Sequence, residues 1–259
     1  VRVNPDGSPD PTFVQLSPLG LVTEIKTLPD GKVLIGGTMP RGITRLNPDG
    51  SADPTLNPGG SGATGSVAQI TIQPDGKILV SGQFQSYNGV ATYSVLRLNA
   101  DGTPDTGFTS PFPPQRTVRH SAVQSDGKII VCGNFLFETG PYYQLARLNS
   151  DGTLDASFNS GSFTTDFAII SVYVDPLDRP IIVGLFGRVN ETTRHGIARL
   201  NPNGSLDATF GPQVPEYTSV YSAALKPDGK IVIAGYFRSL SVGANQPPVI
   251  QLNTDGTLD

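Results

Sequence analysis

Short runs of apolar residues, each followed by a tight turn, recur along the whole chain. In residues 67–72 (VAQITI) apolar and polar positions alternate, which predicts a β-strand with one buried face. Residues 77–84 (KILVSGQF) follow the turn Pro74-Asp75-Gly76 and carry apolar side chains on both faces, which predicts a strand covered on both sides. Asp-Gly between two such runs is a strong hairpin signal, because glycine accepts a positive φ. Since no stretch shows a helical period, we expect an all-β protein.

Two motifs alternate along the chain and divide it into repeats. Copies of the first motif, which reads RLNADGTPD in one of them, begin at Arg2, Arg45, Arg97, Arg147, Arg199 and Gln251. Copies of the second motif, PDGKILVSG, begin at Pro29, Pro74, Ser125, Pro176 and Pro227. Equivalent positions of the second motif are 45, 51, 51 and 51 residues apart. A period of this length indicates a repeat architecture.

These repeats predict a β-propeller built from four-stranded antiparallel blades of about 51 residues. In this architecture the two neighbouring blades cover both faces of each central strand, as its apolar side chains require. We expect a single domain over residues 1–259, with a partial repeat over 1–13 and further repeats over 14–56, 57–108, 109–158, 159–210 and 211–259. The chain starts and stops at the same phase of the repeat. The chain is either a segment of a longer repeat protein, which we favour, or a closed ring in which the N-terminal partial repeat completes the blade begun by the C-terminus.

In combination, PDGKILVSG and RLNADGTPDTGF strongly resemble the bacterial delta-60 repeat, a β-propeller repeat of unknown function. The resemblance covers essentially the whole chain and implies a secreted or surface-attached bacterial protein built from tandem copies. It carries no known catalytic residues. The chain departs from the pattern at Leu177-Asp178-Arg179, where Asp-Gly-Lys is expected, and at Asn203, which stands in place of aspartate.

The composition excludes several classes of function. The formal net charge of -4 argues against nucleic acid as the main partner. A single cysteine, Cys132, excludes an intrachain disulfide framework, and two histidines, His120 and His195, leave little for a histidine metal site. No apolar run is long enough for a membrane helix, so we expect no direct membrane insertion. The Asn-x-Asp-Gly turns lack EF-hand spacing and are explained by local Asx turns, so we expect no metal and no cofactor.

The loops that differ between copies lie on the face opposite the tight turns, and we expect a binding site on this variable face. Every basic residue of these loops is an arginine, and guanidinium groups pair with planar anions and stack on rings. We therefore predict an anionic or sugar-like ligand. The alternative is that the rings fill gaps between blades and the arginines cap loops. The candidate ligand-binding residues are Arg116, Arg188, Arg194, Tyr142, Tyr143, Tyr87 and Tyr217.

A second candidate site lies on the innermost strands. Seven residues before each turn glycine or its equivalent stands a polar residue, and two residues earlier stands an apolar one. Since an unpaired buried polar group is costly, these side chains are predicted to form a polar ring around a hydrated central channel. The ring is either a structural plug or a site for an ion or small ligand. Its members are Glu24, Gln69, His120, Ser171 and Ser222.

Catalysis has little support in the sequence. There is no GxSxG nucleophile elbow, and Glu24 is the one acidic residue of the innermost strands. We therefore expect a non-enzymatic binding or spacer module of a secreted or surface-attached bacterial protein, mediating adhesion or protein interaction. The alternatives are a lectin-like propeller with sugar pockets between blades and a glycan-active hydrolase that uses Glu24. The expected partners are a protein, a surface glycan or further repeats of the parent chain.

Overall fold

The computed structural model of the chain describes residues 1–14, 20–135, 143–159, 168–216, 218–237 and 248–259. Within these residues every helix or strand assigned is a β-strand, which confirms the all-β prediction. The strands pair antiparallel in small sheets. The chain divides into two compact units, Val1–Val118 and Arg119–Asp259.

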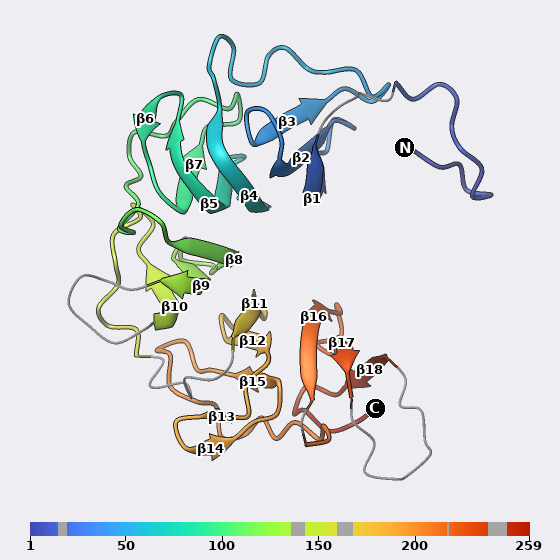
Figure 1. Cartoon of the computed structure of the whole chain (residues 1–259). Coiled ribbons are helices and arrows are strands. Elements are labelled where there is room, and N and C mark those ends of the chain that lie inside the picture. Colours follow the sequence, from blue (N-terminus) through green and yellow to red (C-terminus); the bar gives the residue numbers. More distant parts are fainter. Residues whose placement is uncertain (15–19, 136–142, 160–167, 217, 238–247) are drawn as a thin grey trace. The chain divides into compact units, whose positions relative to one another are not determined.

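The first unit contains two sheets (Figure 1). The first consists of β1 (Leu21–Thr27), β2 (Val33–Thr38) and β3 (Ile43–Leu46), paired in this order. The second consists of β4 (Ala63–Ile72), β5 (Ile78–Tyr87), β6 (Val90–Ala91) and β7 (Val95–Leu98), with β5 between β4 and β7. The turn glycines Gly31 and Gly76 have φ of 80° and 82°, so the Asp-Gly hairpins form as the sequence predicts.

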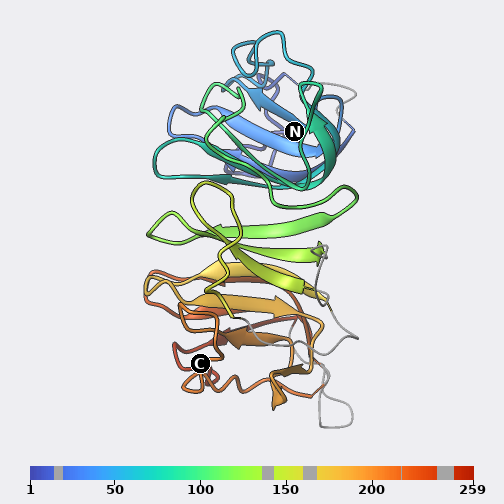
Figure 2. The ribbon, with the colours of Figure 1, turned by 90° about the vertical axis from the view of Figure 1, so that its left-hand side faces the viewer.

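The remaining sheets belong to the second unit, the first of them starting at its boundary. The third sheet consists of β8 (Thr117–Val123), β9 (Ile129–Phe135) and β10 (Tyr143–Leu148), which lie side by side in green in Figure 2. The fourth consists of β11 (Ile169–Val174), β12 (Pro180–Gly184) and β15 (Ile197–Arg199), beside a hairpin of β13 (Arg188–Val189) and β14 (Thr192–Thr193). The fifth consists of β16 (Ser219–Leu225), β17 (Ile231–Tyr236) and β18 (Val249–Leu252).

The fourth strand expected in each repeat is reduced to a single bridge. The residue before each Asn-x-Asp-Gly turn pairs with one residue after it, as Leu148 does with Leu154. The pairing stops there because the next residue, Asp155, accepts hydrogen bonds from the backbone N–H and hydroxyl of Ser157 at 2.9 and 2.6 Å and starts a new turn. The number of blades in the complete propeller stays a prediction.

An ion-pair network ties the second strand of a repeat to its third strand. In the third sheet, the carboxylate of Asp155 accepts from Lys128 Nζ and from Arg147 Nε, both at 2.8 Å. Asp105 makes the same contacts with Lys77 at 2.9 Å and Arg97 at 2.6 Å. The hydrogen bond from Lys77 and those from the Gly107 N–H and Arg97 outweigh the opposing effect of burial and lower the pKa of Asp105 to about 2.

The arginine of this network also joins its repeat to the next one. The guanidinium of Arg147 lies 4.8 Å from the ring centroid of Phe158, and its Nη1 donates to the carbonyl of Pro202 in the next Asn-x-Asp-Gly turn. Arg199 Nη1 donates in the same way to the carbonyl of Thr254 at 2.5 Å. One guanidinium can make all these contacts because its N–H groups point in fixed directions from a planar fork.

The residue three positions after each turn glycine or its equivalent lies at the centre of the second strand. This residue is at most 1% exposed in the first four sheets, as Leu34, Leu79, Ile130 and Ile181. The apolar pattern of this strand predicts full burial of Ile130 and of its equivalent in the fifth sheet, Val232. For Val232 this prediction is wrong, because Val232 is half-buried. The fifth sheet is the last of its unit, and the face that packs against β12 carries Ile231 and Ile233 instead.

Replacement of Ile130 by alanine tests the packing between sheets. The Ile130 side chain is fully buried in a cluster with Val172 and Ile182 of the next sheet, so Ile130→Ala is expected to lower the free energy of unfolding by about 2–5 kcal/mol. Val232→Ala should cost less, because Val232 is half-buried. Urea unfolding measures both. A loss below about 1 kcal/mol for Ile130→Ala would contradict the packing described here.

The stability of the fold is expected to fall in acid. Because the pKa of Asp105 is about 2 in the folded chain, below its ordinary value of about 3.9, its ion pairs contribute fully above pH 4 and are lost as the pH falls towards 2. Urea midpoints between pH 7 and pH 2 measure this loss. Asp105→Asn should be less stable at pH 7 and should vary less with pH; an unchanged pH dependence would refute the assignment.

Candidate functional site

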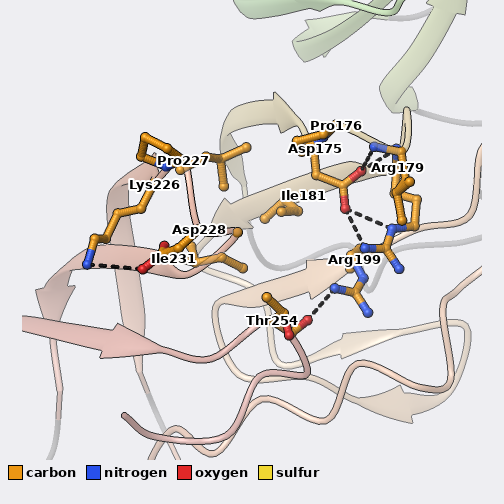
Figure 3. Close-up of a pocket in the computed structure, with 13 residues that line it drawn as sticks. Asp175, Pro176, Arg179, Ile181, Arg199, Lys226, Pro227, Asp228, Ile231 and Thr254 are labelled. Carbon is orange, nitrogen blue, oxygen red and sulfur yellow. Dashed lines mark hydrogen bonds and ion pairs between the residues drawn. The ribbon is translucent and has the colours of Figure 1, made fainter.

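A cavity of about 400 Å³ lies in the second unit, between the first turns of the fourth and fifth sheets (Figure 3). Its walls are formed by the turn after β11 and the turn after β16. The apolar lining comes from Pro176, Leu177, Ile181, Leu225, Pro227 and Ile231. The polar lining includes Asp175, Arg179, Arg199, Lys226, Asp228 and Thr254. The volume falls within the range of small-molecule sites.

The equivalent space between the third and fourth sheets is bridged by hydrogen bonds. Gln124 Nε2 donates to the carbonyl of Asp178 at 2.8 Å. The Asp178 carboxylate accepts from the backbone N–H of Ser125 at 2.8 Å and also from the Ser125 hydroxyl. Asp178 can do this although it stands where the other copies have glycine, because aspartate tolerates its φ of 59°. This departure from the repeat therefore links two neighbouring turns.

Between the fourth and fifth sheets each of these bridging groups is replaced. Asp175 stands where Gln124 stood and has no N–H to donate; Pro176 replaces Ser125 and lacks both the N–H and the hydroxyl. Gly229 replaces Asp178 and has no carboxylate. Asp175 instead bonds within its own turn, where Arg179 Nε and Nη2 each donate to its Oδ2 at 2.7 Å. The hydrogen bonds that bridge the preceding interface are therefore absent at the cavity.

The charged groups around the cavity differ in how well they are paired. Arg199 is held by Asp207 at 2.7 Å and by the Thr254 carbonyl. Burial alone would raise the pKa of Asp207, but hydrogen bonds from Thr209 and Arg199 lower it below its usual range, so this carboxylate stays ionised. Lys226 Nζ is held loosely, 3.6 Å from Asp228 and 3.3 Å from Gln251 Oε1.

The sequence analysis placed the candidate binding site on the opposite, variable face. It did not predict a cavity on the face of the tight turns. Two signals could have located it: the drifted turn 175–179, and Lys226 at a position occupied by Gln73 and Gln124 in earlier copies. Neither change indicates a cavity by itself, because the cavity forms between two turns that are brought together only in the folded chain.

The arginines predicted to bind a ligand on the variable face lie in different places. Arg188 is exposed on the β13–β14 hairpin, with Glu191 3.6 Å away. Arg194 is half-buried, and its Nη1 donates to the Thr193 carbonyl at 2.8 Å. Arg116 belongs to the first unit and is half-buried. A common ligand site for them stays a prediction.

The predicted tyrosines divide into one core residue and three whose side chains lie outside the described residues. Tyr87 is 1% exposed and its hydroxyl donates to the Gly102 carbonyl at 2.8 Å, so it is a core residue and not a ligand-binding one. Burial raises the pKa of Tyr87 to about 12. Tyr142 and Tyr217 lie outside the described residues, and the side chain of Tyr143 does too.

The residues predicted to ring a central channel follow an irregularity in the first strand of the sheet. The strand register shifts just before Glu24, Gln69, Ser171 and Ser222. Such β-bulges re-aim the side chains that follow them. Because Glu24 and Gln69 belong to one compact unit and the other members to the second, the ring stays a prediction.

The local surroundings of these residues are defined within each unit. Glu24 lies 2.8 Å from Lys26 in an ion pair. In the second unit, the ring of His120 lies 5.3 Å from the ring of Tyr173, whose hydroxyl accepts from the Ala223 N–H at 3.0 Å and lies 3.5 Å from Ser222 Oγ. Tyr173 therefore joins the first strands of the fourth and fifth sheets.

Cys132 and the metal-ligating residue types form no reactive centre in the part of the chain that the structure describes. Cys132 is fully buried, and burial raises the pKa of its thiol to about 12. No group of His, Cys, Asp and Glu among the described residues is placed to hold a metal ion. In the Asn-x-Asp-Gly turns, carboxylates such as that of Asp49 accept from the N–H and hydroxyl of Ser51 at 2.9 and 2.7 Å.

Solved structures of other proteins share this fold. The chain is similar to a catalytically inactive virginiamycin B lyase from Staphylococcus aureus, at 15% identity and a TM-score of 0.60 over 95% of this chain and 71% of that one. It is also similar to a gluconolactonase from Xanthomonas campestris, at 16% identity and a TM-score of 0.54 over 83% of this chain and 69% of that one. At such identities the similarity is one of fold.

These similarities correct the prediction that the chain is not an enzyme. That prediction rested on missing hydrolase motifs, yet the same fold occurs in a gluconolactonase and a virginiamycin B lyase. The fold therefore does not exclude catalysis, because chemistry depends on the site that a fold carries.

A further similar structure belongs to the surface of a bacterium. It is the extracellular domain of a hybrid two-component system from B. thetaiotaomicron, at 16% identity and a TM-score of 0.57 over 96% of this chain and 30% of that one. The similarity is again one of fold. In the described part of the chain, no helix has the length and apolar character needed to cross a membrane.

A search of curated protein sequences finds no match to this chain. A family description does match, over residues 1–13, 28–56, 73–108, 124–158, 181–210 and 226–259, which together exceed half of the chain. The matched segments contain both repeat motifs. The chain therefore belongs to the DUF5122 β-propeller family, a domain of unknown function.

Proposed function

We propose that this propeller is a binding module of a secreted or surface-attached bacterial protein, mediating adhesion or protein interaction, and that it holds its ligand in the cavity between the fourth and fifth sheets. The observation that carries this proposal is the cavity itself, of about 400 Å³, with charged groups around an apolar base. Sites of this kind, apolar with a few placed polar groups, are typical of ligand binding.

The repeated turns around the cavity support a binding role. The neighbouring interface shows that the same repeat can bridge this space through Gln124, Ser125 and Asp178. At the cavity these bridging groups are absent while the arginine network is kept, including Arg199 on Asp207 at 2.7 Å. A cavity whose walls are already held in place favours ligand binding, because few side chains lose conformational entropy when the ligand binds.

The extracellular setting rests on two further points. The motifs resemble the delta-60 repeat, which implies a secreted or surface-attached protein, and a similar structure is the extracellular domain of a bacterial two-component system. A lectin-like function is the second candidate, because the cavity lies between neighbouring sheets, where a lectin-like propeller would hold a sugar.

Rebuilding the missing links tests this site. The triple variant Asp175→Gln, Pro176→Ser and Gly229→Asp restores the three groups that bridge the preceding interface, so it should keep the fold but close the cavity. We expect the unchanged chain to bind members of a combined glycan and peptide array, and the triple variant to lose that binding while its urea midpoint stays the same.

The control removes the arginines of the variable face, as Arg116→Ala, Arg188→Ala and Arg194→Ala together. Array binding should survive in this control. If it is lost there and kept in the rebuilt turn, the binding site is on the variable face and the cavity proposal is wrong.

A further inference from the structure

We infer that the N-terminal motif of the chain, residues 1–13, is a docking edge for a β-hairpin of the same repeat type, supplied by a separate polypeptide. The hairpin brings the first two strands of a repeat and a lysine directly after their Asp-Gly turn. Three observations in the first unit support this inference: a third strand without a second strand, an aspartate without its lysine, and two exposed apolar residues at core positions.

The N-terminal motif folds as the end of a repeat. Val3 forms with Pro9 the single bridge that follows the third strand in the other repeats. Arg2 Nη1 donates to the Pro48 carbonyl in the turn of the next repeat at 2.5 Å, as the equivalent arginines of later repeats do. The motif therefore occupies the place of a third strand and its turn beside the first sheet.

The third strand of this motif has an open edge. In the first sheet the equivalent residues, 44–46, pair with the second strand β2. Among the described residues, no second strand pairs with residues 1–3. Unpaired backbone N–H and C=O groups along a strand edge can accept an added strand from another chain. The N-terminal motif therefore offers the pairing that a second strand makes in every other sheet.

The ion-pair network of this motif lacks one cation. Arg2 Nη2 lies 2.7 Å from Asp10 Oδ2, and among the described residues no lysine forms an ion pair with Asp10. In the first three sheets, the equivalent aspartate also accepts from the lysine after the Asp-Gly turn of its own repeat, at 2.8 or 2.9 Å. The Arg2 side chain is 44% exposed, whereas its equivalents in the first four sheets are between 5% and 11% exposed. A lysine on the docked hairpin would complete this network with a charge-assisted hydrogen bond.

The strand β1 exposes two apolar residues at positions that are core positions elsewhere. Val22 is 37% exposed and Ile25 is 61% exposed. Their equivalents in the second sheet, Val67 and Ile70, are fully buried, because the second strand of the preceding sheet packs against them. Gly36 of that strand is so close that a Cβ there would lie 2.8 Å from Val67. The element that would cover β1 is therefore the second strand of a repeat.

A single element meets all three requirements. In the second sheet the second strand pairs with the third strand, carries Lys77 directly after the turn, and buries Leu79 fully. Lys77 bonds to the aspartate of its own repeat, and the residue at the position of Leu79 packs on the next sheet in the case of Leu34. A single apolar strand without the lysine would leave Asp10 without its second cation, so the partner is a hairpin of this repeat type.

The experiment titrates the full chain with a synthetic peptide of residues 67–82, which contains the hairpin of the second sheet. Isothermal titration calorimetry is expected to show binding at one site, and none for a scrambled peptide of the same composition. Lys77→Gln in the peptide should weaken binding about tenfold, because it removes one charge-assisted hydrogen bond. Leu79→Ala in the peptide should weaken binding about thirtyfold or more, because it removes most of a buried apolar side chain.

Variants of the chain locate the docking edge. Asp10→Asn should weaken the unchanged peptide about tenfold and leave the Lys77→Gln peptide unaffected, because both changes remove the same ion pair. Ile25→Ser should weaken the peptide and leave the urea midpoint of the chain unchanged, because this side chain is mostly exposed. Asp101→Asn is the matched control and should have no effect. It copies Asn203, which accepts the same two hydrogen bonds within its turn.

A graft tests the same contacts even if the free peptide does not form a hairpin, since isolated hairpins are marginally stable. Residues 63–95 placed directly before Val1 recreate a complete repeat and should raise the urea midpoint, and Lys77→Gln in the graft should remove part of this gain. The inference is overturned by equal binding of the scrambled peptide or by an equal effect of Asp10→Asn on both peptides. It is also overturned if the peptide does not bind and the graft leaves the midpoint unchanged.

Discussion

In each full repeat, the first side chain of the first motif bonds to the aspartate that follows the turn of its own repeat. In most copies this side chain is an arginine, which also donates a hydrogen bond to a carbonyl in the turn of the next repeat. Arg147 pairs with Asp155 at 2.8 Å, covers the ring of Phe158 and donates to the Pro202 carbonyl in the following repeat. Lysine could not replace it, because a single ammonium lacks the planar fork that points at all these partners together. This contact fixes the turn of one repeat against the turn of the next, and so it holds consecutive sheets side by side. The packing of the central strands depends on that arrangement.

This constraint explains why divergence at the turns is informative. Where the arginine network is kept, the turns are free to change only in the residues that face the neighbouring turn. At one interface these residues are Gln124, Ser125 and Asp178, which bridge the gap. At the next they are Asp175, Pro176 and Gly229, and a cavity of about 400 Å³ remains. The cavity thus lies beside the drifted turn 175–179, where the arginine network is kept.

The fold itself is a poor guide to activity. It is shared with a lyase, a gluconolactonase and the extracellular domain of a two-component system at 15% or 16% identity, so chemistry must be argued from the residues of a site. In the described residues the strongest candidate for such a site is the cavity on the face of the tight turns. The loops of the variable face remain a separate prediction, in which Tyr87 has no part because it belongs to the core.

The sequence by itself determined the repeats, the hairpins, the all-β class and the burial of Ile130, because these follow from local turn chemistry and from the apolar pattern of single strands. It also identified the drifted turn at Leu177-Asp178-Arg179. Only the tertiary structure decided that Val232 is half-buried, since its burial depends on a sheet packed against it and not on its own strand. The cavity was decided in the same way, because it arises between Asp175 and Gly229, residues far apart in sequence whose missing links matter only where their turns meet.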